Sequence, residues 1–199
     1  MSITIANGGD GPVVNVKVNE RNELYVRSTS TQENLAATTR GKSYNINTGT
    51  ITLTDSVDTP VLYLKNNENP DLHIVAVAIG LGTETGGTAT QSLEITIVRN
   101  PTAGTIVSNA TAVAINSNRN FGSSNVLLAD AYKGATGSTM TDGIDHLFIY
   151  AADFGRGFFE IDSVLTKGDS IGVKINPTAG NSSLPLYCAL ICHLEDEKA

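Results

Sequence analysis

The chain has 199 residues, of which 40% are hydrophobic, with 19 glycines and no tryptophan. This composition excludes a disordered chain and is typical of an ordered, turn-rich protein with its own core. Acidic residues outnumber basic residues by 20 to 13, which gives a formal net charge of −7. Because no run of basic residues occurs, we expect no binding to the phosphate backbone of a nucleic acid.

The sequence also lacks the signals of membrane insertion and secretion. No apolar run approaches the roughly 20 residues that a membrane span requires, so we expect no membrane association. The first residues, MSITIA, contain no basic region and are followed at once by NGGDG, which leaves no room for a signal-peptide core. We therefore expect a protein that is made and folded in a cytoplasm.

Residues 1–40 have the pattern of a small arm. Residues 3–6 are strand-like, and a glycine cluster follows them. Alternating valines over residues 13–18, a polar turn, and a second apolar run over residues 23–28 predict a β-hairpin. A lone hairpin is marginally stable in water, so this one must lie on the main domain, a neighbouring subunit or a larger partner. Its candidate contact residues are Val14, Val16, Val18, Leu24, Tyr25 and Val26. A helical turn over residues 31–39 would link this arm to the main domain.

The main domain is predicted to begin at Gly41 and to span residues 41–199. Its first stretch reads as three short strands over residues 43–47, 50–55 and 60–66, because Ile51 and Leu53 alternate with threonines. Thr48 and Gly49 would form the first turn between them, since glycine readily adopts the positive φ that tight turns need.

Further strands follow at intervals of about ten residues, the spacing of an antiparallel sandwich. We expect them over residues 72–80, 92–98, 105–107, 111–115, 146–151, 158–161, 172–175 and 184–194. The strand over residues 72–80 is apolar on both faces and should be central. Val113 and Ile115 should point inward, Phe121 should anchor a polar surface loop, and residues 134–143 should form a mobile, exposed loop. The fold class is therefore all-β, and eight main strands with long end loops favour a jelly roll.

A search for catalytic chemistry finds no converging set of reactive groups. His73, His146 and His193 sit singly on predicted strands without a zinc-ligand spacing, although three copies of one histidine could meet at an oligomer axis. Cys188 and Cys192 lie on one face of a strand about 13 Å apart, too far to form a disulfide with each other. A carbohydrate or calcium site among Asp142, Asp145, Asp153 and Asp162 stays open, but their spacing matches no known loop motif. We expect no enzyme activity, no cofactor and no bound metal.

Several segments do resemble a known type of protein: VNVKVNERNELYVRSTS, GKSYNINTGTITLTDSVDTPVLYLKNNENPDLHI, ITIVRNPTAGTIVSN, NSNRNFGSSN and VLTKGDSIGVKINP. Together they cover most of the chain from Val14 to Asn176. The chain is similar to tailed-bacteriophage virion proteins in which a short N-terminal β arm precedes a jelly-roll domain. These motifs are structural, so the resemblance concerns the fold and the setting more than a specific role.

The resemblance implies a head decoration or cement protein that stabilises the virion by binding the major capsid protein at the capsid surface. It also implies a homotrimer, with the arm docked on the capsid protein or swapped between protomers. One alternative is a neck, tail or fibre protein that binds a receptor or glycan through loops 82–91 and 134–143. A cupin-type enzyme on the same fold would need a histidine-rich metal set, which this chain lacks.

Overall fold

A computed structural model describes residues 2–5, 14–17, 33–54, 56–82, 92–108, 112–151, 156–177 and 183–195. The chain divides into two compact units, Met1–Gln32 and Glu33–Ala199. In the described residues, no helix is long and apolar enough to span a bilayer. The predicted arm over residues 1–40 stays a prediction, since much of the first unit lies outside the described residues.

The first unit contains a two-stranded antiparallel sheet. Strand β1 (Ser2–Ile5) pairs with β2 (Val14–Lys17), with Ser2 opposite Lys17 and Ile5 opposite Val14. The described partner of the valine strand is therefore the first strand of the chain. The returning strand predicted over residues 23–28 lies outside the described residues.

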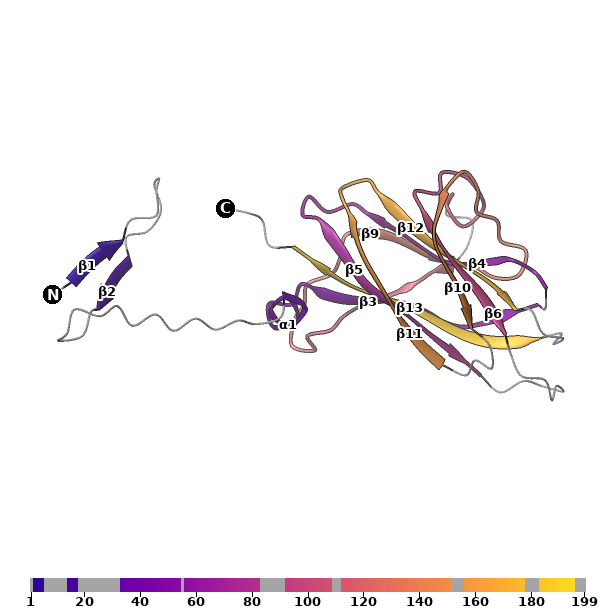
Figure 1. Cartoon of the computed structure of the whole chain (residues 1–199), viewed down its shortest axis with the longest axis horizontal. Helices are drawn as coiled ribbons and strands as arrows, with labels where there is room; N and C mark the ends of the chain where they lie inside the picture. The colour runs from indigo at the N-terminus through magenta and orange to yellow at the C-terminus, as the bar shows by residue number, and fades with distance from the viewer. Residues whose placement is uncertain are drawn as a thin grey trace. The chain divides into compact units, whose positions relative to one another are not determined.

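The second unit is an antiparallel β-sandwich of two sheets, shown in Figure 1. Over the described residues, one sheet has the strand order β10-β6-β12-β4-β9-β7 and the other has the order β11-β5-β13-β3-β8. The strands are β3 (Ser43–Leu53), β4 (Thr59–Asn66), β5 (Leu72–Leu81), β6 (Leu93–Arg99), β7 (Ala112–Val113), β8 (Ile115–Asn118), β9 (Ala129–Lys133), β10 (Ile144–Ala151), β11 (Arg156–Leu165), β12 (Ser170–Pro177) and β13 (Leu184–Leu194).

The pairing of the eight long strands identifies the topology. Along the chain, the first of these strands pairs with the last, β3 with β13. The next pairs inward are β4 with β12, β5 with β11, and β6 with β10. Such nested antiparallel pairing is a long hairpin rolled into two sheets, as in a jelly roll. The predicted all-β sandwich is thus confirmed, and its strand order is consistent with the predicted jelly roll.

The alternating side chains of the central strands fill the space between the sheets. The largest fully buried side chains of this core are aliphatic: Ile46, Leu53, Leu62, Leu64, Leu72, Ile74, Leu93, Ile95, Ile97, Ile171 and Ile175. The predicted central position of residues 72–80 is confirmed, because β5 lies between β11 and β13. The predicted inward face of residues 92–98 is confirmed too, since Leu93, Ile95 and Ile97 are fully buried.

A segment of about forty residues separates β6 from β10 and carries the short strands β7, β8 and β9. Strand β8 extends one sheet beside β3, and β9 extends the other beside β4. Helix α1 (Glu33–Thr39) belongs to the same unit and contacts β3 and β13, with Ala37 buried. The helix predicted as a linker therefore packs on the sandwich.

The predicted turn at Thr48 and Gly49 is wrong, because β3 runs unbroken from Ser43 to Leu53. Opposite these two residues, β13 contributes only Cys188, so they form a β-bulge. Gly49 has a φ of +62°, which suits a bulge as well as a turn. The Cys188 backbone N–H donates to the Thr48 hydroxyl over 3.1 Å, which ties the bulge to the neighbouring strand.

Three predictions in the segment between β6 and β10 are also wrong. Residues 105–107 form a turn around the buried Ile106. Val113 and Ile115 point outward, and the small Ala114 between them is buried instead. Phe121 is fully exposed and anchors no loop. For Val113 and Ile115 the alternation was present, but the sequence does not state which face meets the core.

The loop over residues 134–143 is exposed over most of its length, as predicted, but Gly134 and Met140 in it are buried. Met140 is buried with Tyr63, Val98 and Ile106 in a second, smaller apolar cluster. Backbone hydrogen bonds tie Thr141 to Ala103, and the Ile106 N–H donates to the Thr139 carbonyl. The buried Met140 side chain and these backbone hydrogen bonds together hold a loop that is otherwise rich in glycine and threonine.

Candidate interaction surface

Reactive side chains form no metal-binding group in the part of the chain that the structure describes. The closest approach to a catalytic pair joins β10 and β11, where Ser163 Oγ lies 3.2 Å from His146 Nε2 beside a hollow of about 270 Å³. Over the described residues, no carboxylate hydrogen-bonds to the His146 ring, which a nucleophilic serine would need to orient its base. The pair can link the edges of the two sheets, and the geometry offers no further chemistry.

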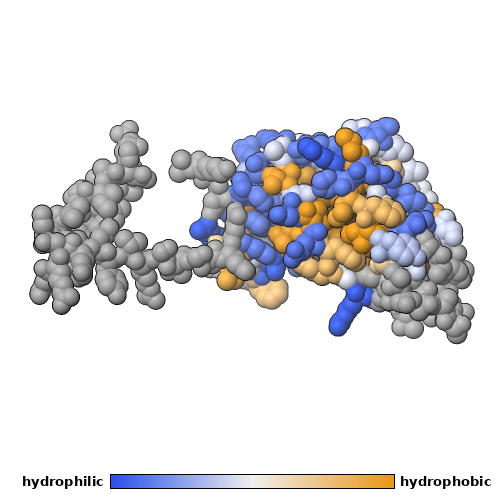
Figure 2. Space-filling model, viewed as in Figure 1, coloured by the Kyte–Doolittle hydropathy of each residue, from blue (hydrophilic) through white to orange (hydrophobic). Residues whose placement is uncertain are grey.

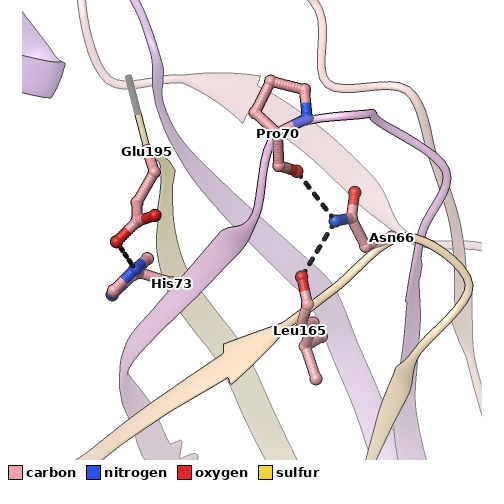
Figure 3. Close-up of polar contacts among 5 residues, drawn as sticks. All are labelled: Asn66, Pro70, His73, Leu165 and Glu195. Atoms are coloured by element: carbon pink, nitrogen blue, oxygen red, sulfur yellow. Dashed lines mark hydrogen bonds and ion pairs between the residues drawn. The ribbon is translucent and has the colours of Figure 1, made fainter. Parts of the chain in front are cut away.

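Two of the three histidines meet, although the sequence placed them singly. His73 on β5 and His193 on β13 are cross-strand neighbours with their ring centroids 5.1 Å apart and the rings nearly parallel. His73 Nε2 also lies 2.7 Å from Glu195 Oε1, and Figure 3 shows this contact. The pair holds the residue that follows β13 against the sheet.

A buried asparagine organises the same end of the sandwich. The Asn66 side-chain amide donates to the Pro70 carbonyl over 3.1 Å and to the Leu165 carbonyl over 2.9 Å, as drawn in Figure 3. Its side-chain oxygen accepts from the Glu68 N–H. Asn66 is fully buried, so these bonds fix the ends of β4 and β11 to the loop that leads into β5.

Both cysteines are free and buried, as predicted. Burial raises the pKa of the Cys188 and Cys192 thiols to about 12. Because the thiolate is the reactive form, neither residue can act as a nucleophile at neutral pH.

Asp169 is the aspartate with the most organised surroundings. Hydrogen bonds from the Thr166 side chain (2.7 Å) and from Asn100 (2.9 Å) hold the pKa of this carboxyl below its usual value. Asp142 and Asp162 have positive φ values of 63° and 47° and shape a loop and a bulge. Asp142, Asp145 and Asp162 belong to no metal-binding group among the described residues. Asp153 lies outside the described residues.

The outer face of the sheet β11-β5-β13-β3-β8 has an apolar centre. Ala78 and Ala189 are cross-strand neighbours there, with Phe158 on the other side of Ala78. Tyr187 lies opposite Gly80, so short side chains leave a hollow of about 700 Å³ between two exposed rings. Figure 2 shows apolar residues gathered in the middle of this domain, over the strands that Figure 1 labels β11 and β13. A hollow of this kind suits contact with another protein.

Strands β10 and β11, the edge strands of the two sheets, carry further exposed apolar side chains. On β10, Phe148 is 61% exposed and Tyr150 is 60% exposed, and on β11 Phe158 is 57% exposed. Ile144 and Val164 are exposed as well. Large apolar side chains are enriched at protein interfaces, so this side of the sandwich is the candidate interaction surface. We call it the β10/β11 side.

The sequence pointed elsewhere for partner contacts. Val14 and Val16 lie on β2, and Val18, Leu24, Tyr25 and Val26 lie outside the described residues. Their predicted role stays a prediction. The β10/β11 side was missed, although one signal was present: residues 144–151 are apolar on both faces, which an edge strand can accommodate only by exposing one of them.

No protein-family model and no curated protein matches the chain. The proposals below therefore depend on the residues themselves and on the resemblance described above.

Proposed function

We propose that this protein is a structural subunit of a bacteriophage virion, a decoration protein that stabilises the head by binding the major capsid protein. The observation that carries the proposal is the β10/β11 side, where exposed aromatic and aliphatic residues follow two long edge strands. Free strand edges and exposed apolar side chains favour protein–protein contact.

The division of the chain supports the same role. A sandwich that buries a large aliphatic core can fold without a partner, whereas an isolated two-stranded sheet such as β1–β2 is marginally stable in water. The arm gains stability when it docks on a larger surface, and the resemblance supplies the capsid as that surface. The sandwich supplies bulk and contacts between copies, which the resemblance suggests are arranged as a trimer.

The test is a binding experiment on heads that lack this protein. The matched variants are the full-length chain and a deletion of residues 1–32, which retains α1 because Ala37 of that helix is buried on the sandwich. We expect the full chain to decorate heads and the deletion variant to remain folded, by circular dichroism, without binding. Full decoration by the deletion variant would refute docking by the arm. Failure of the full-length chain to bind any part of the head would refute the decoration role.

A further inference from the structure

Strand β11 offers a long free edge. It has ten residues, pairs with β5 along one side, and is the last strand of its sheet among those that the structure describes. Its N-terminal half is regular, because residues 156–160 pair with β5 without a break. A register shift follows between Glu160 and Ser163, so a partner strand could continue the sheet over about five residues.

The side chains on this regular half follow a symmetric pattern. Arg156, Phe158 and Glu160 alternate with less exposed residues, so all three lie on the outer face. The arginine precedes the phenylalanine by two residues and the glutamate follows it by two. Over the described residues, neither charged side chain has an ion-pair partner.

This spacing makes the edge complementary to itself. In an antiparallel pair, a step of one residue forward on one strand is a step of one residue back on the other, so the numbers of opposite residues have a constant sum. If two copies pair with Phe158 opposite Phe158, then Arg156 of each copy faces Glu160 of the other. One strand therefore supplies both members of two ion pairs and both rings of a central aromatic pair, an arrangement that an isologous contact requires.

We propose that two copies of this chain associate edge to edge along β11, about a twofold axis at Phe158. The pairing joins their sheets into one continuous sheet that crosses the axis. Two copies of a chain with a net charge of −7 repel each other, so the contact must not add like charges. This segment meets that condition, because its one positive and one negative charge cancel within each copy.

The contact goes beyond the proposed function. It uses β11 of the same β10/β11 side, but its test concerns the purified protein alone and can fail independently of head binding. It is twofold and therefore separate from the threefold contact that the resemblance implies. If both exist and the twofold axis is perpendicular to the threefold axis and intersects it, the closed assembly is a hexamer of two trimers.

The first test uses charge reversal and sedimentation velocity over a concentration series. Arg156→Glu places two like-charged pairs across the axis, and Glu160→Arg does the same with the opposite sign. We expect each variant to lose about tenfold or more in the twofold association constant, since two attractive cross-strand pairs become repulsive. An equimolar mixture of the two variants should recover association as a heterodimer, and the double variant should associate like the wild type.

The second test reports the register. Directly opposite residues have Cα atoms about 5 Å apart, within disulfide range. Phe158→Cys should therefore cross-link to its own copy under mild oxidation. Glu160→Cys is the matched control, because the two copies of residue 160 would lie about 13 Å apart and should not cross-link.

Three outcomes would overturn the proposal: a wild type without twofold association at several hundred micromolar, reversal variants that associate normally, or a mixture that recovers nothing. Circular dichroism of every variant shows whether a loss of association reflects a loss of folding. These exposed positions should leave the fold intact.

Discussion

The two sides of the sandwich end their sheets in opposite ways. On one side the last strands are β7, with two residues, and β8, with four residues that are mainly polar. On the other side they are β10 and β11, with eight and ten residues and with exposed aromatic side chains on both. The first side also carries the connecting segments between β6 and β10, whereas the second leaves long strand edges in view.

This contrast is the reason why we propose the β10/β11 side as the place of a partner. A free strand edge is a template for another chain, and proteins usually shorten it, charge it or cover it. The β7/β8 side follows that rule through its short strands and a network of asparagines, although Val113, Ile115 and Phe121 are exposed there. The β10/β11 side departs from it with two long edge strands, and we propose that a partner covers them. Substitutions on the two sides should therefore differ in their effects on stability, and the largest effect is expected on the β7/β8 side.

On the β7/β8 side, we expect the largest loss of stability from a substitution of Asn118. Its side-chain amide donates to the Gly41 carbonyl over 2.8 Å and to the Asn125 carbonyl over 3.0 Å, and its oxygen accepts from the Asn120 N–H. We expect Asn118→Ala to lower the free energy of unfolding by about 2 kcal/mol, because these partners lose their bonds in a partly buried site. Urea denaturation measures the change.

The neighbouring Ser117 provides the control for that variant. It is exposed, and its hydroxyl makes one long bond of 3.4 Å to the Asn45 carbonyl. Ser117→Ala should therefore change the stability by less than about 0.5 kcal/mol. Equal effects from the two substitutions would show that the asparagine network does not hold this side closed.

Asp169 lies in the turn between β11 and β12 and accepts a hydrogen bond from Asn100, which follows β6. Its pKa is lowered in the folded state, mainly by the Thr166 side chain. The resulting stability is present above the unfolded pKa, near 3.8, and is lost as the pH falls through the lower folded value. We expect Asp169→Asn to cost about 1 kcal/mol at pH 7, because a neutral amide accepts these bonds less well.

The measurement for Asp169 is urea denaturation at pH 7 and at a series of pH values below 4. The difference between wild type and variant should shrink as the pH falls, since protonation removes the same charge from the wild type. A constant difference across the series would contradict the role of the ionised carboxyl.

The smallest effect is expected on the open side. Phe148 on β10 is exposed, so Phe148→Thr should change the free energy of unfolding by less than about 0.5 kcal/mol. The same change should raise the concentration at which light scattering detects association. Phe148→Tyr retains the ring and serves as the control. A loss of several kcal/mol would mean that this side is stabilised within the single chain and is not an interface.

The sequence predicted the centre of the fold better than its edges, and the reason is physical. Strands such as β6 and β13 are buried by both neighbouring strands and the opposite sheet, so their apolar patterns carry the information. Ile95 and Ile97 could thus be assigned correctly. Val113 and Ile115 alternate just as regularly, yet the smaller Ala114 faces the core, because edge strands can turn either face inward.

The pairing between strands that are distant in the sequence could not be predicted from the local pattern of apolar residues. Gly49 is equally suited to a turn and to a bulge, and only the single residue opposite, Cys188, decides between them. His73 and His193 are 120 positions apart, and a two-residue change of register would separate their rings. The same holds for the candidate surface: the exposure of Phe148 and Phe158 follows from the position of β10 and β11 in their sheets.

The nested pairing has a consequence for synthesis on the ribosome. Strand β13 lies between β3 and β5, so its sheet has a gap at its centre until residues 184–194 have left the exit tunnel. Until then β3 and β5 each expose an edge and an apolar face, and β3, which can already pair with the short β8, lacks its long partner some 140 positions later. Such long-range closure makes folding slow and leaves nascent chains prone to aggregation.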